Sequence, residues 1–271
     1  MTNRDALEGL RIGLLGCGNM GGSVLRAVAD ALGSGDALRV FDPDPDRALS
    51  LSTVTGATVE QSGDAVLAHC DVVMLACKPQ DAVAALAGLR WPERPLGLVS
   101  MLAGMRVDRV RELVPEQVRV TRVMPNVAAL VGAGITGVLA TGDDELDQWT
   151  TALFETCGEV VTLAKEEQFD ALTGVSGSGP AYLFVAMEAL ADGGVRMGLP
   201  RDVALRLAIH TVRGAGVLAA STVDHPAVLK DRVASPGGTT IEALAVLEAA
   251  GFRSALIEAV TASCERSKDL A

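Results

Sequence analysis

Residues 235–240, with the sequence SPGGTT, combine residue types that can hold a small anion. Gly237 and Gly238 have no Cβ, so their backbone N–H groups can approach a ligand closely. Thr239 and Glu242 have the spacing of a capping box, which predicts that a helix begins here with unpaired N–H groups and the positive end of its dipole. A carboxylate could therefore bind at this segment without a lysine or arginine. The same residues are also compatible with a Gly-Pro turn before an ordinary capped helix.

A glycine-rich turn near the N-terminus predicts a second, nucleotide-binding site. Its sequence is GCGNMG at 16–21, between a buried strand expected at 11–15 and a helical pattern over 20–32. A further strand at 37–41 ends in Asp42. Strand, G-x-G-x-x-G, helix, strand and acid in this order are typical of a βαβ unit that binds a dinucleotide.

The three glycines of this turn have different expected roles. Gly16 permits the tight turn, Gly18 lets the backbone approach a pyrophosphate, and Gly21 lets the helix pack closely on the strand. Asp42 can accept hydrogen bonds from both ribose hydroxyls and would repel a 2′-phosphate, whereas Arg47 could pair with that phosphate. Asp42 therefore favours NADH over NADPH, and the alternative is that the DPDPD run at 42–46 forms only a solvated loop.

The ends of the later strands predict where the crevice continues. Apolar strands are expected at 71–76, 96–100, 118–124 and 159–163. Ligands of open parallel sheets bind beyond the carboxyl ends of the strands. The residues at these ends are candidates for the crevice: Lys78, Pro79, Ala103, Gly104, Pro125 and Asn126. Taken singly, each is equally compatible with a turn or a strand stop.

After residue 164 the pattern is almost entirely helical, which predicts two domains. Residues 1–164 would form an α/β domain with a Rossmann-type doubly wound sheet, and 165–271 an all-α domain. Helices in the second domain are apolar around much of their circumference, as at 182–190 and 204–217, so they must be buried. We expect a homodimer through this domain, most simply with two-fold symmetry, and burial against the first domain is the alternative.

Composition limits the partners and the compartment. The net charge of −11 and the lack of a basic run argue against nucleic acid or an anionic membrane. Five cysteines without a C-x-x-C indicate neither a disulfide framework nor a metal site. The N-terminus lacks the apolar run of a signal peptide, and no stretch approaches the roughly 18 apolar residues of a membrane span. We expect a cytoplasmic protein with no metal, nucleic acid or membrane partner.

Several motifs, in order along nearly the whole chain, make it resemble pyrroline-5-carboxylate reductase. They are IGLLGCGNMGGSV at 12–24, CKPQ at 77–80, RVMPN at 122–126, TGVSGSGPAY at 173–182 and HPAVLKDRVASPGGTT at 225–240. The resemblance implies hydride transfer from NAD(P)H to the C=N bond of 1-pyrroline-5-carboxylate, which gives L-proline in the last step of proline biosynthesis. It implies NADPH as the usual cofactor, an assumption that Asp42 puts in doubt.

The resemblance also implies roles for individual residues. The cofactor would contact Gly16, Gly18, Asn19, Met20, Gly21, Asp42, Lys78, Pro79, Ala103 and Asn126. The substrate would contact Ser235, Gly237, Gly238, Thr239 and Thr240. Thr240 would hold the ring nitrogen in line for reduction, and Ser235 and Lys78 are further catalytic candidates. In the family this loop reaches the site from the partner subunit, and dimers can assemble into rings.

Two other function classes are compatible with parts of the sequence. β-Hydroxyacid dehydrogenases share the two-domain plan and carry a catalytic lysine after a G-x-x-G-x-G turn. Gly174, Gly177 and Gly179 have that spacing, but Leu183 stands at the position of the lysine and cannot transfer a proton. A sensor that binds NAD(P)H without catalysis is the other class, and it has no need for a second anion site at 235–240.

Overall fold

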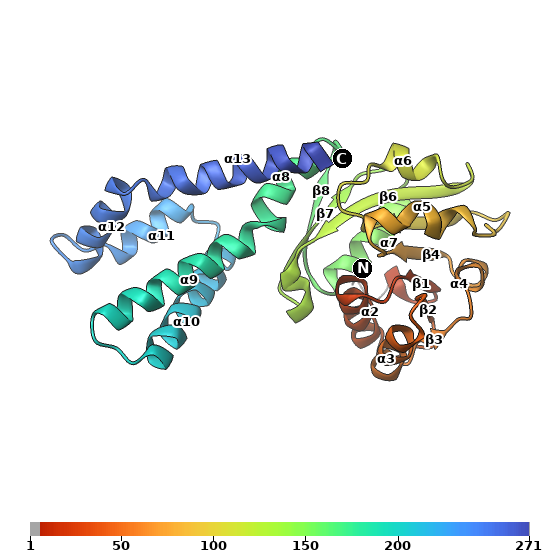
Figure 1. Ribbon diagram of the computed structural model, residues 1–271, viewed down its shortest axis with the longest axis horizontal. Coiled ribbons are helices and arrows are strands. Elements are labelled where there is room, and N and C mark those ends of the chain that lie inside the picture. The colour runs from red at the N-terminus through yellow and green to blue at the C-terminus, as the bar shows by residue number, and fades with distance from the viewer. Residues whose placement is uncertain (1–5, 271) are drawn as a thin grey trace. The chain divides into compact units, whose positions relative to one another are not determined.

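The computed structural model describes residues 6–270, which divide into two compact units (Figure 1). The first unit extends to Gly177 and also includes the chain from Cys264 onward, and the second is Ser178–Ser263. The contacts thus place the short helix after residue 164 with the first unit, whereas the sequence pattern placed it with the second domain. The last helix begins in the second unit and ends in the first.

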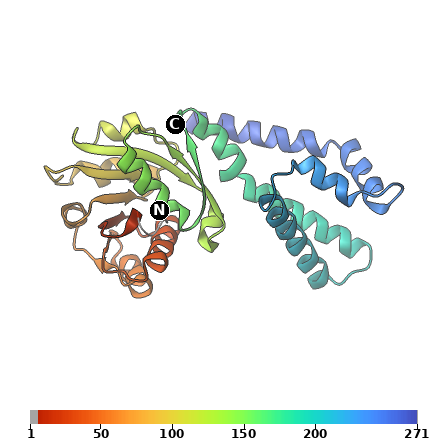
Figure 2. The ribbon, with the colours of Figure 1, turned by 180° about the vertical axis from the view of Figure 1, so that it is seen from behind.

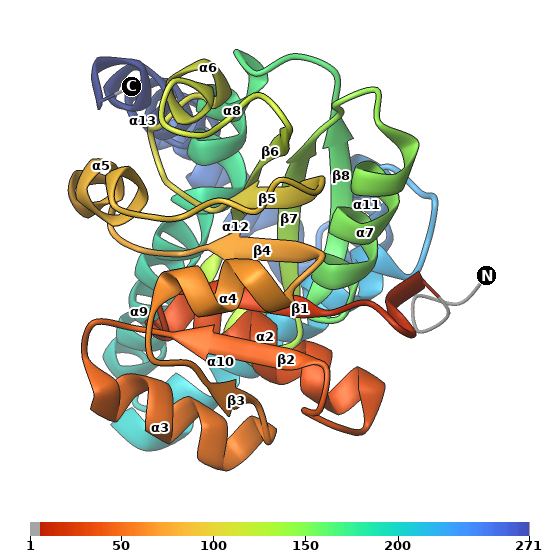
Figure 3. The ribbon, with the colours of Figure 1, turned by 90° about the vertical axis from the view of Figure 1, so that its right-hand side faces the viewer.

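An eight-stranded sheet forms the centre of the first unit, in the order β3-β2-β1-β4-β5-β6-β7-β8 (Figure 3). Its strands are β1 Ile12–Leu15, β2 Leu38–Phe41, β3 Thr58–Val59, β4 Val72–Leu75, β5 Leu96–Ser100, β6 Val118–Pro125, β7 Gly134–Leu139 and β8 Gly158–Leu163. Neighbouring strands are parallel except β6 and β7, which are antiparallel. The doubly wound Rossmann-type sheet is confirmed, although the sequence did not predict β3 and β7.

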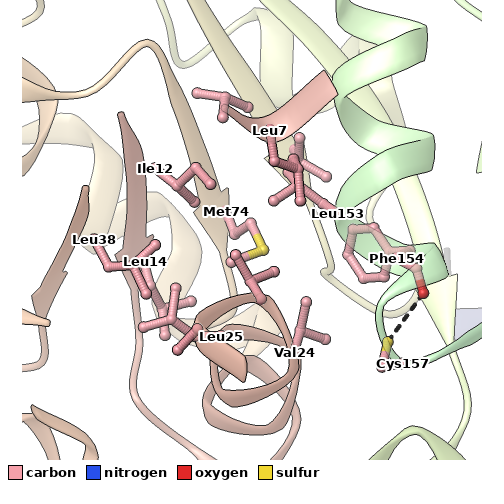
Figure 4. Close-up of a cluster of buried hydrophobic side chains, with 14 of the residues drawn as sticks. Leu7, Ile12, Leu14, Val24, Leu25, Leu38, Met74, Leu153, Phe154 and Cys157 are labelled. Carbon is pink, nitrogen blue, oxygen red and sulfur yellow. Dashed lines mark hydrogen bonds between the residues drawn. The ribbon is translucent and has the colours of Figure 1, made fainter. Parts of the chain in front are cut away.

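Helices cover both faces of this sheet because its strands are apolar on both sides. The helices and turns of the unit are α2 Asn19–Leu32, α3 Pro45–Thr55, α4 Gly63–His69, α5 Pro79–Ala87, α6 Val107–Arg111, the 3₁₀ turn Val127–Val131, α7 Asp144–Glu155, α8 Gln168–Leu172 and the π-helical turn Thr173–Gly177. One core cluster joins the sheet to α2, α3 and α7, and the other joins it to α4, α5 and α6. Figure 4 shows Val24 and Leu25 of α2 beside Leu14 and Met74 in the first cluster.

The second unit is helical throughout, as predicted for the C-terminal domain (Figure 2). Its helices are α9 Gly179–Arg196, α10 Arg201–Ala220, α11 Pro226–Val233, α12 Thr239–Ala249 and the first part of α13 Phe252–Leu270. Its buried apolar cluster consists of Ala191, Ala204 and Ala208, with Val195 partly buried against them. Larger apolar side chains such as Phe184 and Leu207 are more than half exposed. A single copy of this unit therefore has almost no hydrophobic core.

Helix α10 is an exception to the expectation that no stretch has the length and apolar character of a membrane span. By length and composition it could cross a membrane, with a mean hydropathy of 1.3. Only 11% of that stretch is buried within the chain. Length and composition are weak grounds for a membrane span, because a helix that packs against a partner subunit has the same character.

Candidate active site

The glycines at 16–21 occupy positions with three different steric requirements. Gly16 has φ +99°, and a Cβ there would lie 2.8 Å from the backbone of Ala76 and Cys77. A Cβ on Gly21 would lie 2.7 Å from the Cβ of Ala76, so this glycine lets α2 pack against the loop after β4. A Cβ on Gly18 would meet nothing within 4 Å. The fold thus requires Gly16 and Gly21, whereas the space beside Gly18 is open to a ligand.

That open space belongs to a cavity of about 1240 Å³ at the carboxyl ends of β1, β2 and β4. Its lining includes Gly16, Cys17, Gly18, Asn19, Met20, Asp42, Arg47, Cys77 and Lys78. Strand order reverses at β1, which is where dinucleotides bind in doubly wound sheets. The first turn of α2 points its N–H groups here, and no side chain caps it. The cavity residues therefore fit the adenosine and diphosphate of NAD(P)H.

Asp42 is tied to the glycine turn through its own hydrogen bonds. One carboxylate oxygen accepts from the Cys17 backbone N–H at 2.7 Å, and the other accepts from the Asp44 N–H at 2.9 Å. Each oxygen keeps a further lone pair, so the carboxylate can still accept from a ribose hydroxyl. Burial, with a smaller contribution from Asp42, raises the pKa of the Cys17 thiol to about 12. Cys17 is therefore a neutral side chain that fills space at physiological pH.

Two arginines line the same cavity and could oppose the effect of Asp42 on a 2′-phosphate. Arg47 forms an ion pair with Asp44 at 3.2 Å, and Arg26 donates to the Ser23 hydroxyl at 3.4 Å. The sequence pattern indicated Arg47 but not Arg26. The available signal was the position of Arg26 in the second turn of α2, shortly after the glycine fingerprint.

The other predicted cofactor contacts lie in different surroundings. Lys78 lines the cavity as the residue before α5, and Pro79 is the first residue of that helix. Ala103 is exposed in the loop after β5. Asn126 is buried, and both ends of its amide are used within the chain. Its oxygen accepts from the Ile135 N–H and its nitrogen donates to the Ser176 carbonyl, both at 3.2 Å. Neither Ala103 nor Asn126 is among the residues that line the cavity.

The segment 235–240 forms a tight turn followed by α12. The Gly238 N–H donates to the Ser235 carbonyl at 3.0 Å, and Gly237 has φ +66°. Proline second and a left-handed glycine third are typical of a type II turn. A Cβ on Gly238 would lie 2.3 Å from the Ser235 hydroxyl, so a larger residue here would displace that side chain.

The capping box predicted at Thr239 is wrong. Gly238 is the N-cap of α12 in extended conformation, Thr239 is already helical, and no side chain caps the helix. The physical reason is that the turn brings the chain into the helix one residue earlier than the T-x-x-E spacing suggests. The first N–H groups of α12 are consequently left without a side-chain cap, next to the hydroxyls of Ser235, Thr239 and Thr240.

The break predicted near 176–180 is a π-helical turn at Thr173–Gly177, between α8 and α9. π-Helical turns are frequent at functional sites. Beyond it, the Ser178 and Ser263 hydroxyls lie 2.9 Å apart, and the Tyr182 hydroxyl donates to the Ala259 carbonyl at 3.3 Å. These bonds join α9 to α13 within the second unit. No cluster of metal-ligating side chains occurs within residues 6–270.

Comparison with known proteins finds relatives that match the chain along both units. Residues 166–270 match the family described as pyrroline-5-carboxylate reductase dimerisation, and residues 11–104 match the family described as NADP oxidoreductase coenzyme F420-dependent. The pyrroline-5-carboxylate reductase of Synechocystis sp. is 42% identical over 265 residues, which cover 96% of this chain and 98% of the relative. That of Escherichia coli is 38% identical over 269 residues, with coverage of 96% and 98%.

Solved structures agree with these sequence relatives. A pyrroline-5-carboxylate reductase from Coxiella burnetii superposes with a TM-score of 0.92 at 29% identity, covering 97% of this chain and 98% of the other. The Plasmodium falciparum enzyme with NADP bound superposes with a TM-score of 0.81 at 28% identity, with the same coverage. The fold, the NAD(P)H-dependent oxidoreductase class and the presence of a dimerisation domain are thereby established. The chain belongs to the pyrroline-5-carboxylate reductase family.

Proposed function

We propose that the protein reduces 1-pyrroline-5-carboxylate to L-proline with NAD(P)H, as the last step of proline biosynthesis. The observation that carries this proposal is the full-length match to reductases of that name, at up to 42% identity. The chain also contains the two sites that the reaction needs, a dinucleotide cavity and a turn suited to a small carboxylate. A sensor that only binds the cofactor has no use for the second site.

Residues of the first unit bind and orient the cofactor. Gly16, Gly18, Asn19, Met20 and Gly21 hold the diphosphate at the start of α2, and Asp42 holds the adenosine ribose. Lys78, Pro79 and Ala103 position the nicotinamide half directly, and Asn126 contributes by fixing the chain after β6, since both ends of its amide are bonded within the protein. When bound, NAD(P)H supplies a hydride to the carbon of the C=N bond. The protein contributes the position of the two reactants and the local electrostatics.

Residues of the 235–240 turn bind the substrate. The N–H groups at the start of α12, with Ser235, Gly237, Gly238 and Thr239, hold the carboxylate. Thr240 hydrogen-bonds the ring nitrogen and keeps it in line. No further proton donor is needed when the imine binds in its protonated form. Lys78 either contacts the cofactor or acts as a general acid.

The first test is steady-state oxidation of NADH and, separately, NADPH with pyrroline-5-carboxylate as the acceptor. Turnover with either cofactor supports the reductase. The ratio of the two kcat/KM values shows which effect on cofactor preference is larger. Asp42 favours NADH, whereas Arg26 and Arg47 favour NADPH. Binding of both cofactors without oxidation of either one would contradict the proposal and favour the sensor.

Substitution of Thr240 tests the role of the turn. Thr240→Ala lowers kcat by about 10- to 1000-fold, the range for loss of one hydrogen bond to the reacting group. Thr261→Ala is the matched control, because the Thr261 hydroxyl donates to the Ile257 carbonyl of its own helix. Wild-type kinetics in Thr240→Ala would remove Thr240 from the mechanism.

The protein acts as a homodimer through its helical unit, with the substrate turn supplied by the partner subunit. Dimers formed from Thr240→Ala and Gly18→Asp protomers test this arrangement. If the turn acts in the partner's site, one of the two sites is intact and activity returns on mixing. If it acts within its own subunit, both sites stay defective.

Light scattering reports whether dimers assemble further into rings, and cell fractionation tests the cytoplasmic location without a membrane or nucleic-acid partner.

A further inference from the structure

Glu166 connects three segments of the first unit that are far apart in the sequence. One of its carboxylate oxygens accepts from the Arg122 guanidinium at 3.0 Å and from the backbone N–H of Val107 at 2.8 Å. The other oxygen lies 3.7 Å from the guanidinium of Arg106. The side chains of Arg122 and Glu166 are only 6% and 11% exposed. This is a buried ion pair that also holds the start of α6.

The Arg122 side chain is fixed on several sides. Its guanidinium lies over the ring of Phe169, 4.6 Å from the centroid. On the neighbouring strand, Ser100 is its register partner at the end of β5. Within the described chain, the Arg122 Nε and the Ser100 hydroxyl are buried without a hydrogen-bond partner. An arrangement that leaves polar atoms unpaired is poorly suited to stabilising the fold.

Stability alone is a weak reason for a buried ion pair. The cost of removing both charges from water offsets most of their attraction, and well-packed apolar replacements are often neutral or stabilising. A role in fixing geometry explains the pair better. The geometry that it fixes is that of residues 101–106, the loop that joins β5 to α6.

That loop is held at both ends and lies at the carboxyl edge of the sheet. At its start the Met101 N–H donates to the Leu75 carbonyl at 3.0 Å, and Leu102 is buried in the core. At its end Val107 is held by Glu166. Between these anchors lies the exposed Ala103. The loops after β1, β4 and β5 follow one another along this edge, where the two halves of a dinucleotide bind.

We propose that Arg122 and Glu166 are positioning residues for catalysis, which act by fixing the 101–106 loop against the nicotinamide half of the cofactor. The proposal rests on the proposed function, because it assigns this loop to hydride transfer from NAD(P)H. Neither residue touches the reacting atoms. The loss of either changes the alignment of the cofactor more than its affinity, since the diphosphate is held by the separate turn at 16–21.

Arg119 provides a matched control on the same strand. It pairs with Asp143 at 3.3 Å and Glu145 at 2.7 Å, and its guanidinium lies 5.0 Å from the centroid of the Trp149 ring. Its Nε is also buried without a partner in the described chain. Arg119 therefore makes the same kinds of contact as Arg122, although its ion pairs are more exposed. It lies nearer the other end of β6, and its partners belong to α7 and the N-cap of that helix.

The kinetic test compares Glu166→Gln, Arg122→Lys and Arg119→Lys. The first two keep the side-chain size and lower kcat by about 10- to 100-fold, as expected for a misplaced reactant. The KM for the cofactor changes by less than about 3-fold, because the contacts that bind the cofactor equally in the ground state and the transition state are retained. Arg119→Lys keeps the wild-type kcat. The double variant Arg122→Lys/Glu166→Gln is no slower than either single variant, since the pair acts as a unit.

Hydrogen exchange gives a second readout that does not need turnover. In Glu166→Ala, which removes the acceptor of the Val107 N–H, amides over 101–111 exchange faster than in the wild type, whereas Arg119→Lys leaves this segment unchanged. Wild-type kcat in folded Glu166→Gln and Arg122→Lys, or an equal loss in Arg119→Lys, overturns the proposal. Unchanged exchange over 101–111 in Glu166→Ala also overturns it. If the wild type itself fails to reduce pyrroline-5-carboxylate while exchange responds as expected, the proposed function fails and the loop anchor stands.

Discussion

The two units of this chain bury their apolar residues to very different extents. In the first unit, two clusters of fully buried side chains, including Leu25, Met74 and Phe154, fill both faces of the sheet. In the second, α11 and α12 have no buried residue and the buried cluster is made of three alanines. Hydrophobic burial is the main favourable term in folding. The first unit can thus obtain its stability within one chain, whereas the second must obtain it from another copy.

The largest effect that tests this contrast is expected at Leu207 in α10, which is 54% exposed in the single chain. Leu207→Glu places a charge on an exposed apolar face that we expect a partner subunit to cover, and burying an unpaired charge is very costly. We expect the dimer to dissociate and the helical unit to lose structure. Light scattering measures the mass, and circular dichroism measures the loss of helix.

Leu49 in α3 is the matched control for this change, since it is 61% exposed but lies in the first unit. Leu49→Glu should leave the mass, helicity and melting temperature of the protein close to wild type. If Leu49→Glu and Leu207→Glu behave alike, the contrast between the two units is wrong.

A smaller but still large effect is expected in the core of the first unit. Phe154 in α7 is fully buried. Phe154→Ala removes its ring and leaves a cavity, which lowers the free energy of unfolding by about 3–5 kcal/mol. The loss should be the same at low and high protein concentration, because Phe154 packs within one chain. Chemical denaturation at two concentrations measures this, and a concentration-dependent loss would link Phe154 to the dimer instead.

The next effect separates ligand binding from folding within one turn. Gly18→Ala has open space for its Cβ and an ordinary negative φ, so the fold should be unchanged. Cofactor affinity should fall about 10-fold, because the methyl group occupies space beside the diphosphate. Gly21→Ala should instead destabilise the protein by about 1–3 kcal/mol through overpacking. Fluorescence titration with NADPH and thermal melting distinguish the two, and equal melting temperatures would contradict the steric assignment.

The smallest effect concerns the pairing of β1 with β4. Arg11 donates to Asp71 from its backbone and its guanidinium, which lowers the pKa of the Asp71 carboxyl below its ordinary value of 3.8. A lowered folded-state pKa stabilises the protein above pH 3.8 and loses this contribution as the pH falls through the folded-state pKa. Asp71→Asn should therefore cost about 1 kcal/mol or less at pH 7, since Arg11 is half exposed.

Thermal melts from pH 7 to pH 3 measure this difference. The gap between Asp71→Asn and the wild type should close in the acid range. The exposed Asp36 has no such partner among residues 6–270, and Asp36→Asn should melt like the wild type throughout. A gap that stays constant down to pH 3 would show that the ion pair is not its cause.

Local sequence patterns predicted the fold more completely than they predicted the site. The apolar runs of β1, β4 and β5 and the long helices of the second unit were found where they were expected. Strand β7, with the sequence GITGVL, was missed because its glycines weaken the strand pattern and its pairing with β6 is antiparallel. The Thr239 capping box failed because a turn one residue earlier decides where α12 starts.

The parts of the site that the sequence did not predict depend on contacts between residues far apart in the chain. Arg122 lies in the RVMPN motif, yet nothing in its neighbours indicates a partner 44 residues further on. Asn126 was expected to contact the cofactor, and its amide is occupied by Ile135 and Ser176. Side-chain roles of this kind follow from packing, which local spacing does not encode.

By itself the sequence determined most of the strands, the long helices of the second unit, the place of the nucleotide turn, and the need of the helical half for a partner. It did so because periodicity, glycine spacing and excess apolar surface are local or additive properties. Only the tertiary structure decided that Gly18 faces open space while Gly21 is closely packed, that Asp42 holds the fingerprint turn, and that Glu166 anchors the 101–106 loop. These depend on distances across the sheet, which are set once all the strands have paired.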